Sequence, residues 1–186
     1  EAKKDLSPFF AELGAYKNAE SYFSKVVRSG EIDRMIERLA YYYADTGNKK
    51  GARFYFKKMI RKNPNAPKSF EYQNQIVNLY LTATKSKIFK QELYHWVEYY
   101  GPKGRWALKN AKAKALVNKS KELVEASLRA YTLQNHQTAQ NSHGAQSTSA
   151  AKNGYELYFK TFVSTPYLGD MHFFFGEMMF DLKKYK

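Results

Sequence analysis

The hydrophobic residues of this chain recur at helical spacing, most clearly in the segment IERLAYYYADTGNKKGARFYFKKMIRKNP, residues 36–64. Apolar side chains there stand three or four positions apart in two successive stretches, which is the period of an amphipathic helix. The small residues Ala40 and Ala52 fall where two antiparallel helices would cross. Gly47 follows the first stretch and Pro64 the second, and both residue types end helices. The pattern therefore predicts a helix–turn–helix unit.

The same pattern recurs earlier in the chain with a period of 33 residues. Four residues of the unit have counterparts one period upstream, Gly14, Ala19, Phe23 and Val26 standing for Gly47, Ala52, Phe56 and Met59. A recurrence at one period predicts tandem repeats, here over residues 1–30 and 31–64. In the first repeat, Ser7 followed by Pro8 predicts a short first helix that begins at Pro8 with Ser7 as its N-cap.

A third helix pair is expected in residues 67–100, on periodicity alone. Its second helix carries apolar residues on one face, at Phe89, Leu93, Trp96 and Tyr100. In this pair Lys90 or Glu92 stands where the repeat has its small alanine. The repeat signature is therefore blurred in this part of the chain.

The rest of the chain predicts further helices. Gly and Pro residues break the chain at 101–104. Residues 105–141 contain neither, and they predict one long helix or two in tandem with an interruption near Asn118. The small polar segment SHGAQSTSAAKN, residues 142–153, predicts a flexible loop. In residues 154–186 the repeat spacing resumes, and it ends in a first helix without its partner.

The spacing in residues 36–64 resembles the tetratricopeptide (TPR) repeat, W-x2-L-G-x2-Y, A-x3-F, P. Residues 1–30 and 154–186 resemble it in part, and the middle third does so only in its helical character. The resemblance implies an all-α, right-handed solenoid of antiparallel helix pairs, in which residues 1–100 and 105–186 pack as one continuous array. It also implies a non-enzymatic scaffold that binds a partner protein or peptide in a concave groove lined by first helices. The positive charge of the chain favours an acidic partner.

The resemblance also identifies the residues expected in that groove. In the best repeat these are Arg34, Glu37, Arg38, Tyr41 and Asp45. In the last unit they are Phe173, Glu177, Phe180 and Asp181. We expect Arg34, Arg38 and Tyr41 to anchor the partner, and the acidic residues Glu37 and Asp45 to set its orientation.

The C-terminal segment YELYFKTFVSTPYLGDMHFFFGEMMFDLKKYK resembles the TPRs of bacterial envelope proteins and of proteins linked to gliding motility. This narrower resemblance implies a periplasmic or envelope-associated location, with a cytoplasmic one as the alternative. Native solenoids end in polar capping helices, whereas this segment is strongly apolar, so we expect a fragment of a longer array. Its uncapped last helix offers a route to self-association.

The charge of the chain adds a second interpretation, since 31 Lys and Arg stand against 17 Asp and Glu, a net charge of +14. Two stretches carry basic residues without any acid, one between Thr46 and Phe70 and the other from Tyr99 to Lys121. The positive electrostatic potential of such stretches favours anionic partners. Along the second helix of the best repeat the cations recur every four residues, at Arg53, Lys57 and Arg61. This basic face is either an ordinary solvated helix face or the surface of a module that binds nucleic acid or another polyanion.

Candidate catalytic chemistry is sparse in this sequence. There is no Cys, so disulfides and thiolate metal sites are excluded. The four His residues are scattered, and neither a Gly-rich phosphate loop nor an H-E-x-x-H or G-x-S-x-G motif occurs. We therefore expect no enzymatic activity, no cofactor and no metal site.

Overall fold

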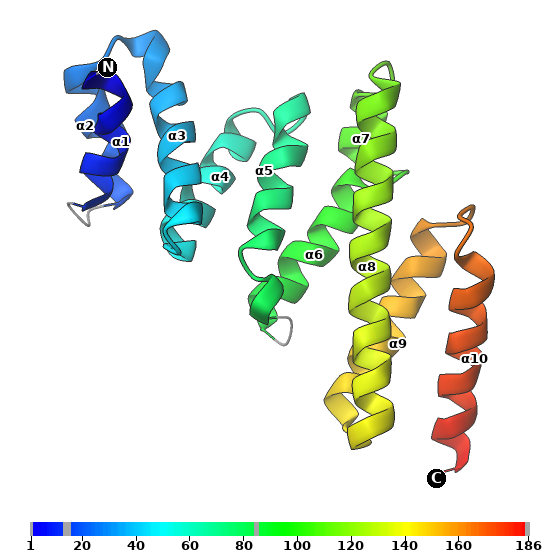
Figure 1. Cartoon of the computed structure of the whole chain (residues 1–186). Coiled ribbons are helices and arrows are strands. Elements are labelled where there is room, and N and C mark those ends of the chain that lie inside the picture. Colours follow the sequence, from blue (N-terminus) through cyan, green and yellow to red (C-terminus); the bar gives the residue numbers. More distant parts are fainter. Residues whose placement is uncertain (1, 13–15, 84–85, 185–186) are drawn as a thin grey trace. The chain divides into compact units, whose positions relative to one another are not determined.

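A computed structural model describes residues 2–12, 16–83 and 86–184 of the chain. Over these residues the structure is all-α, with helices joined by short turns and no strand (Figure 1). The prediction of an all-helical protein is therefore confirmed. The α-helices are, in chain order, α1 (Ala2–Glu12), α2 (Ala19–Val26), α3 (Ile32–Asp45), α4 (Lys49–Lys62), α5 (Pro67–Asn78), α6 (Lys87–Tyr100), α7 (Arg105–Lys109), α8 (Lys114–Ser142), α9 (Ala145–Thr161) and α10 (Leu168–Lys184).

The chain divides into two compact units, unit 1 (residues 1–92) and unit 2 (residues 93–186). In unit 1, α3 packs against α4 and α1, and α4 packs against α5. In unit 2, α8 packs against α9, and α10 contacts both of them. Helices in contact are thus close neighbours in sequence, as expected when each amphipathic helix buries its apolar stripe against the helices that follow it.

The core of unit 1 is built around the α3–α4 pair, where the sequence predicts its helix–turn–helix unit. Leu39 and Ala40 of α3 are completely buried, as are Ala52 and Phe56 of α4. Gly47 lies in the turn between the helices with a φ of +81°, a left-handed conformation that glycine adopts without strain. The helix pair and its turn are therefore present at the predicted positions.

The two helices of this pair approach each other closely at Gly51, near the start of α4. A Cβ atom at this position would lie 2.9 Å from Cδ2 of Tyr43 on α3. The start of α4 is fixed by Asn48, whose side-chain oxygen accepts a hydrogen bond from the Gly51 N–H at 3.0 Å. This N-cap satisfies one of the backbone donors that the first turn of a helix leaves unpaired.

The first helix differs from the prediction. Pro8 lies in the interior of α1, so the expected start at Pro8 with Ser7 as N-cap is wrong. Ser7 is buried, and its hydroxyl donates to the backbone oxygen of Met35 on α3 at 3.3 Å. Serine often caps the start of a helix with its hydroxyl, but here the Ser7 hydroxyl bonds to another helix instead. Gly14, expected to end this helix, lies outside the described residues.

Two predictions for the second half of the chain are corrected by unit 2. Residues 110–113 form a turn between α7 and α8, so the break in the helical segment precedes Asn118. The flexible loop expected over residues 142–153 is wrong, because only His143 and Gly144 separate α8 from α9. His143 has a φ of 48°, and this left-handed residue ends α8.

Packing of α9 against α8 explains why the small polar residues are helical. Ala151 is completely buried, and so are Tyr155 and Tyr158 further along α9. The helices are so close that a Cβ atom at Gly154 would lie 2.4 Å from Oγ1 of Thr132 on α8. A segment rich in small residues has the composition of a loop, but here the small side chains allow α8 and α9 to cross closely. No helix in the described part of the chain combines the length and the apolar character needed to cross a membrane.

Candidate functional site

The structure brings the five groove residues of the best repeat together on one surface of α3. Arg34, Glu37, Arg38, Tyr41 and Asp45 line an open cavity of about 470 Å³, together with residues of α1 and with Tyr42. Their positions repeat every three or four residues along α3, so the helix places them on one face. The resemblance to the repeat predicts this clustering, but it does not predict the contribution of α1.

Two arginines give this cavity, the α3 groove, its charge. Arg34 and Arg38 are exposed, and within the described residues neither makes an ion pair. Glu37, by contrast, is already engaged, because it accepts hydrogen bonds from Lys68 Nζ at 2.8 Å and from the Tyr72 hydroxyl at 3.0 Å. The two guanidinium groups are therefore the cations available in the groove, and their planar donors match the geometry of a carboxylate.

Tyr41 provides the aromatic surface of the α3 groove. Its ring is half-buried and meets the ring of Phe56 edge to face, with centroids 5.1 Å apart. Burial raises the pKa of the Tyr41 phenol, and the negative charges of Glu37 and Glu71 raise it further. The phenol therefore stays neutral at physiological pH and can donate a hydrogen bond beside the two arginines.

A second cavity, of about 320 Å³, continues the polar surface from α3 to α5. Asp45 lines both this cavity and the α3 groove, and Lys49, Gln75 and Thr82 are among the other residues of the second one. The two cavities, which share Asp45, therefore form one run of open surface over α1, α3, the start of α4 and α5.

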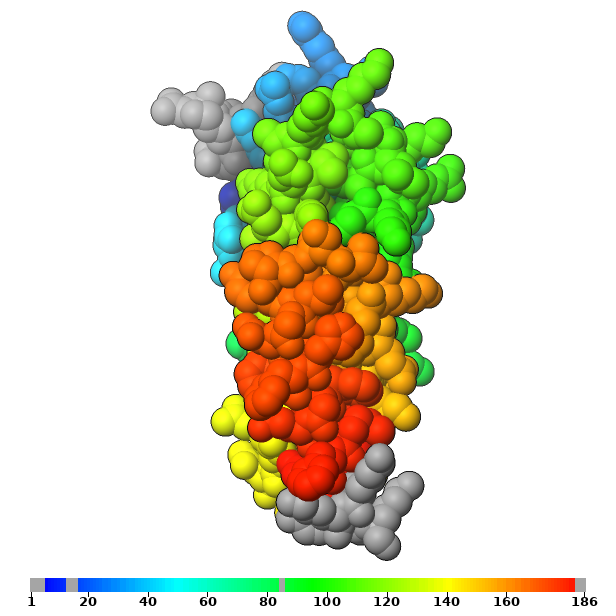
Figure 2. All heavy atoms as spheres, turned by 90° about the vertical axis from the view of Figure 1, so that its right-hand side faces the viewer, coloured from blue at the N-terminus to red at the C-terminus, as the bar shows by residue number. Residues whose placement is uncertain are grey.

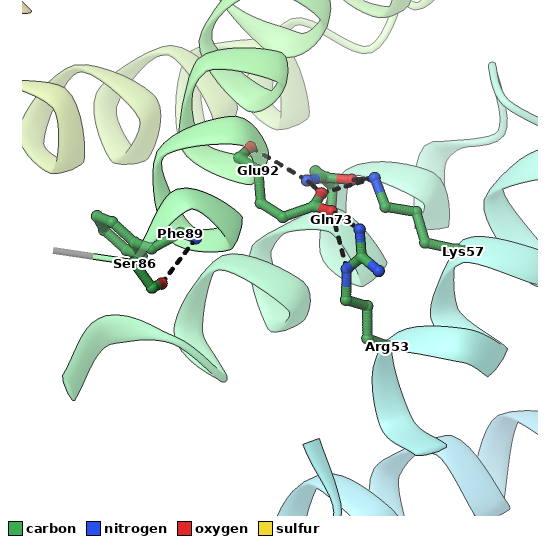
Figure 3. Close-up of polar contacts among 6 residues, drawn as sticks. All are labelled: Arg53, Lys57, Gln73, Ser86, Phe89 and Glu92. Atoms are coloured by element: carbon green, nitrogen blue, oxygen red, sulfur yellow. Dashed lines mark hydrogen bonds and ion pairs between the residues drawn. The ribbon is translucent and has the colours of Figure 1, made fainter. Parts of the chain in front are cut away.

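A polar cluster of a different kind, the Glu92 cluster, joins α4, α5 and α6 (Figure 3). Glu92 of α6 has only 3% of its surface exposed. Its Oε1 accepts hydrogen bonds from Arg53 Nη2 at 2.6 Å and Nε at 2.9 Å. Its Oε2 lies 2.6 Å from Lys57 Nζ and accepts from Gln73 Nε2 at 2.9 Å. Both carboxylate oxygens are thus fully satisfied.

The surroundings of Glu92 keep it ionised. Burial alone would raise its pKa, but hydrogen bonds from Gln73, Lys57 and Arg53, together with the charge of Lys57, outweigh burial. The pKa of Glu92 is therefore held below its ordinary value. A buried carboxylate in this state ties the second helix of one pair to both helices of the next.

The Glu92 cluster changes the interpretation of the predicted basic face. Arg53 and Lys57 are paired with a buried carboxylate, so they do not face solvent as free cations. Arg61, the third residue of the face, is exposed. The sequence signal for this cluster is the charged residue, Lys90 or Glu92, at the position where the predicted repeat has a small alanine, but the partners of Glu92 lie up to 39 positions away.

The predicted residues of α10 lie in unit 2, where Phe173 is 64% exposed and Glu177 is also exposed. Asp181 lines a cavity of about 390 Å³ with residues of α8 and α9, among them His136. His136 is buried, its Nδ1 lies 2.8 Å from the Tyr155 hydroxyl, and burial lowers its pKa. It is therefore a neutral, packed histidine. The described residues contain no group of three or more acidic or histidine side chains placed to hold a metal ion.

Unit 2 contains its own buried glutamate, Glu125 of α8. Oε1 of this side chain accepts from the Tyr158 hydroxyl at 2.5 Å and from Arg129 Nε at 2.9 Å. The Arg129 guanidinium in turn lies 3.7 Å from the ring centroid of Tyr167, a cation–π contact. The polar groups of this cluster are satisfied by one another, which is the arrangement of a structural ion pair rather than of a reactive site.

No protein-family model, no curated protein and no solved structure matches this chain at a significant level.

Proposed function

We propose that this chain is a non-enzymatic, TPR-like scaffold that binds an acidic segment of a partner protein in the α3 groove. The observation that supports it most is the pair of exposed arginines, Arg34 and Arg38, unpaired among the described residues and set beside Tyr41 in an open cavity. Arginine and tyrosine are the residue types that most often dominate binding energy at protein interfaces. Glu37 bonds to Lys68 and Tyr72. Carboxylates of the partner would therefore accept hydrogen bonds from the guanidinium groups of the two arginines.

The solenoid is part of the same proposal. The buried small residues Ala40 and Ala52, and the glycine in the turn between them, support a repeat of the TPR kind in unit 1. Packing of each helix mainly against its neighbours in sequence is also what a repeat array requires. A periplasmic or envelope-associated location belongs to the proposal through the C-terminal segment alone.

The alternative, a polyanion-binding face on α4, has less support. Arg53 and Lys57 would have to break their ion pairs with Glu92 in order to contact a phosphate. The buried carboxylate of Glu92 would then be left without a counter-charge, which is unfavourable. Charge reversal can therefore distinguish the two surfaces, provided that the variants avoid the Glu92 cluster.

The test begins with a display selection of random peptides against the whole chain. We expect the recovered peptides to be rich in Asp and Glu. Their affinity is then measured calorimetrically for the chain with Arg34→Glu and Arg38→Glu. The matched control carries Lys50→Glu and Arg61→Glu, two exposed cations of α4 with the same total change of charge.

We expect the groove variant to lose at least about tenfold in affinity per arginine, and the control to stay within about threefold, since screened long-range charge contributes little. Equal losses of affinity in the two variants would show that binding depends only on the net positive charge of the chain. A loss confined to the control would place binding on α4. Either result would contradict the proposal.

A further inference from the structure

The second acid-free basic stretch lies in unit 2 and takes no part in the α3 groove. Between Glu98 and Glu122 the chain carries only basic charges. Its exposed cations, Lys103, Arg105, Lys109, Lys112, Lys114 and Lys119, make no ion pair within the described residues. We call residues 103–121 the basic segment. It spans α7, the turn after α7 and the first turns of α8.

The basic segment is anchored to the core on one side only. Trp106 of α7 is completely buried, and its ring centroid lies 5.5 Å from that of Tyr100. Ser120 of α8 is also buried, and its hydroxyl donates to the backbone oxygen of Tyr100 at 2.8 Å. The side chain of Asn110 donates to the Trp106 backbone oxygen at 2.9 Å and closes α7. The cations therefore project from a fixed backbone rather than from a loose loop.

An apolar side chain stands exposed among these cations. Leu108 of α7 is 66% exposed, although its neighbours Trp106 and Ala107 are buried. A second one, Val163, is 60% exposed in the connection between α9 and α10. The basic segment and this connection are neighbours, since Asn118 and Lys121 of α8 line one cavity with Ser164 and Thr165 of the connection.

Figure 2 also shows the basic segment next to the α9–α10 connection. The green and yellow-green surface of the basic segment lies directly above the orange surface of the α9–α10 connection. Exposed leucine and valine side chains form no hydrogen bonds, and each leaves apolar area in contact with water.

We propose that the basic segment, with Leu108 and Val163, docks on an anionic lipid bilayer. Lysines near such a surface are attracted by acidic headgroups. Leu108 and Val163 would enter the boundary between headgroups and acyl chains, where apolar side chains are stabilised. A nucleic acid fits less well, because it offers the apolar side chains nothing and because Trp106, the aromatic ring of the segment, is buried and cannot stack on a base.

Vesicle flotation of the whole chain tests the proposal. The probes are vesicles of phosphatidylcholine alone and vesicles of phosphatidylcholine mixed with anionic phosphatidylglycerol, whose negative surface attracts basic segments. We expect binding only to the anionic vesicles. Lys109→Glu with Lys112→Glu should lower the partition coefficient at least about tenfold, since each lysine near the surface contributes roughly fivefold.

Two further variants separate insertion from simple charge attraction. Leu108→Ser with Val163→Ser leaves the charge unchanged, and we expect about a tenfold loss from removing two apolar side chains. Lys50→Glu with Arg61→Glu, in unit 1, changes the charge as much as the lysine variant and should bind within about threefold of the original chain. Both replaced apolar residues are exposed, so far-UV circular dichroism should show unchanged folding.

Four results would overturn the proposal. The first is failure of the chain to float with anionic vesicles. The second is an equal loss in the unit 1 control, which would mean that net charge alone drives binding. The third is full vesicle binding by the serine variant. The fourth is tighter binding of single-stranded DNA that the lysine variant loses and the serine variant keeps. That last outcome would assign the basic segment to nucleic acid.

Discussion

Replacement of Glu92 by glutamine tests whether the Glu92 cluster holds the helix pairs of unit 1 together. The substitution keeps the shape but removes the charge that faces Arg53 and Lys57 at 2.6 Å each. It also replaces one carboxylate oxygen, a hydrogen-bond acceptor, by an NH₂ group, and this donor then faces donors of the neighbouring side chains. Loss of one partner of a fully buried ion pair costs about 3–5 kcal/mol.

The expected loss for Glu92→Gln is somewhat smaller than that range. The side chain of Arg53 is 38% exposed and that of Lys57 23%, so both cations recover part of their hydration. We therefore expect a loss of about 2–4 kcal/mol in the free energy of unfolding. Urea denaturation followed by circular dichroism measures it.

The matched control for this experiment is Glu98→Gln, the same substitution at an exposed position of the same helix. Its effect should stay within about 0.5 kcal/mol. A loss below about 1 kcal/mol for Glu92→Gln, or one equal to that of the control, would refute the assignment of a structural role to the cluster.

The pH dependence gives a second readout of the same cluster. The pKa of Glu92 is lowered in the folded protein relative to its ordinary value of 4.5. A carboxylate with a lowered folded pKa adds stability that is fully present above the unfolded pKa and is lost as the pH falls through the folded pKa. The stability difference between the original chain and Glu92→Gln should thus be constant near neutral pH and shrink below about pH 4.5. A difference that grew on acidification would contradict the sign of the shift.

Two further substitutions test the packing of unit 2. Gly154→Ala would place a Cβ 2.4 Å from Thr132 Oγ1, so thermal denaturation should show a loss of about 1–3 kcal/mol. Adding Thr132→Ala should restore at least half of it, and failure to do so would argue against this helix crossing. Tyr158→Phe removes the 2.5 Å hydrogen bond to the buried Glu125 and should cost about 1.5–3 kcal/mol, whereas Tyr167→Phe, whose ring stays under Arg129, should be nearly silent in the same assay.

The helices themselves follow from the sequence where local signals agree. In residues 36–64, apolar periodicity, small crossing residues and a turn glycine all favour the same helix pair, and the structure contains it. The resemblance to the repeat assigns Arg34, Arg38 and Tyr41 to a groove, and their spacing of three or four residues sets them on one face of α3. These predictions needed only the spacing of residues along one helix.

Other features depend on residues far away in the chain and could not be predicted from local spacing. Ser7 was assigned to a helix cap, but it bonds to α3. Residues 142–153 were assigned to a loop by composition, but their small side chains let α9 pack against α8. The sequence shows a charged residue, Lys90 or Glu92, where the predicted repeat has a small one, yet the role of Glu92 depends on partners from two other helices.

The most direct test of the central claim is a photo-crosslinking experiment with the tightest acidic peptide from the display selection. A benzophenone side chain is placed at Tyr42, which lines the α3 groove, and in a parallel protein at Lys50, which is exposed on α4. We predict that the peptide crosslinks from position 42 and not from position 50, and that unlabelled peptide competes for the adduct. Crosslinking from position 50 alone, or equally from both positions, would contradict a partner site in the α3 groove.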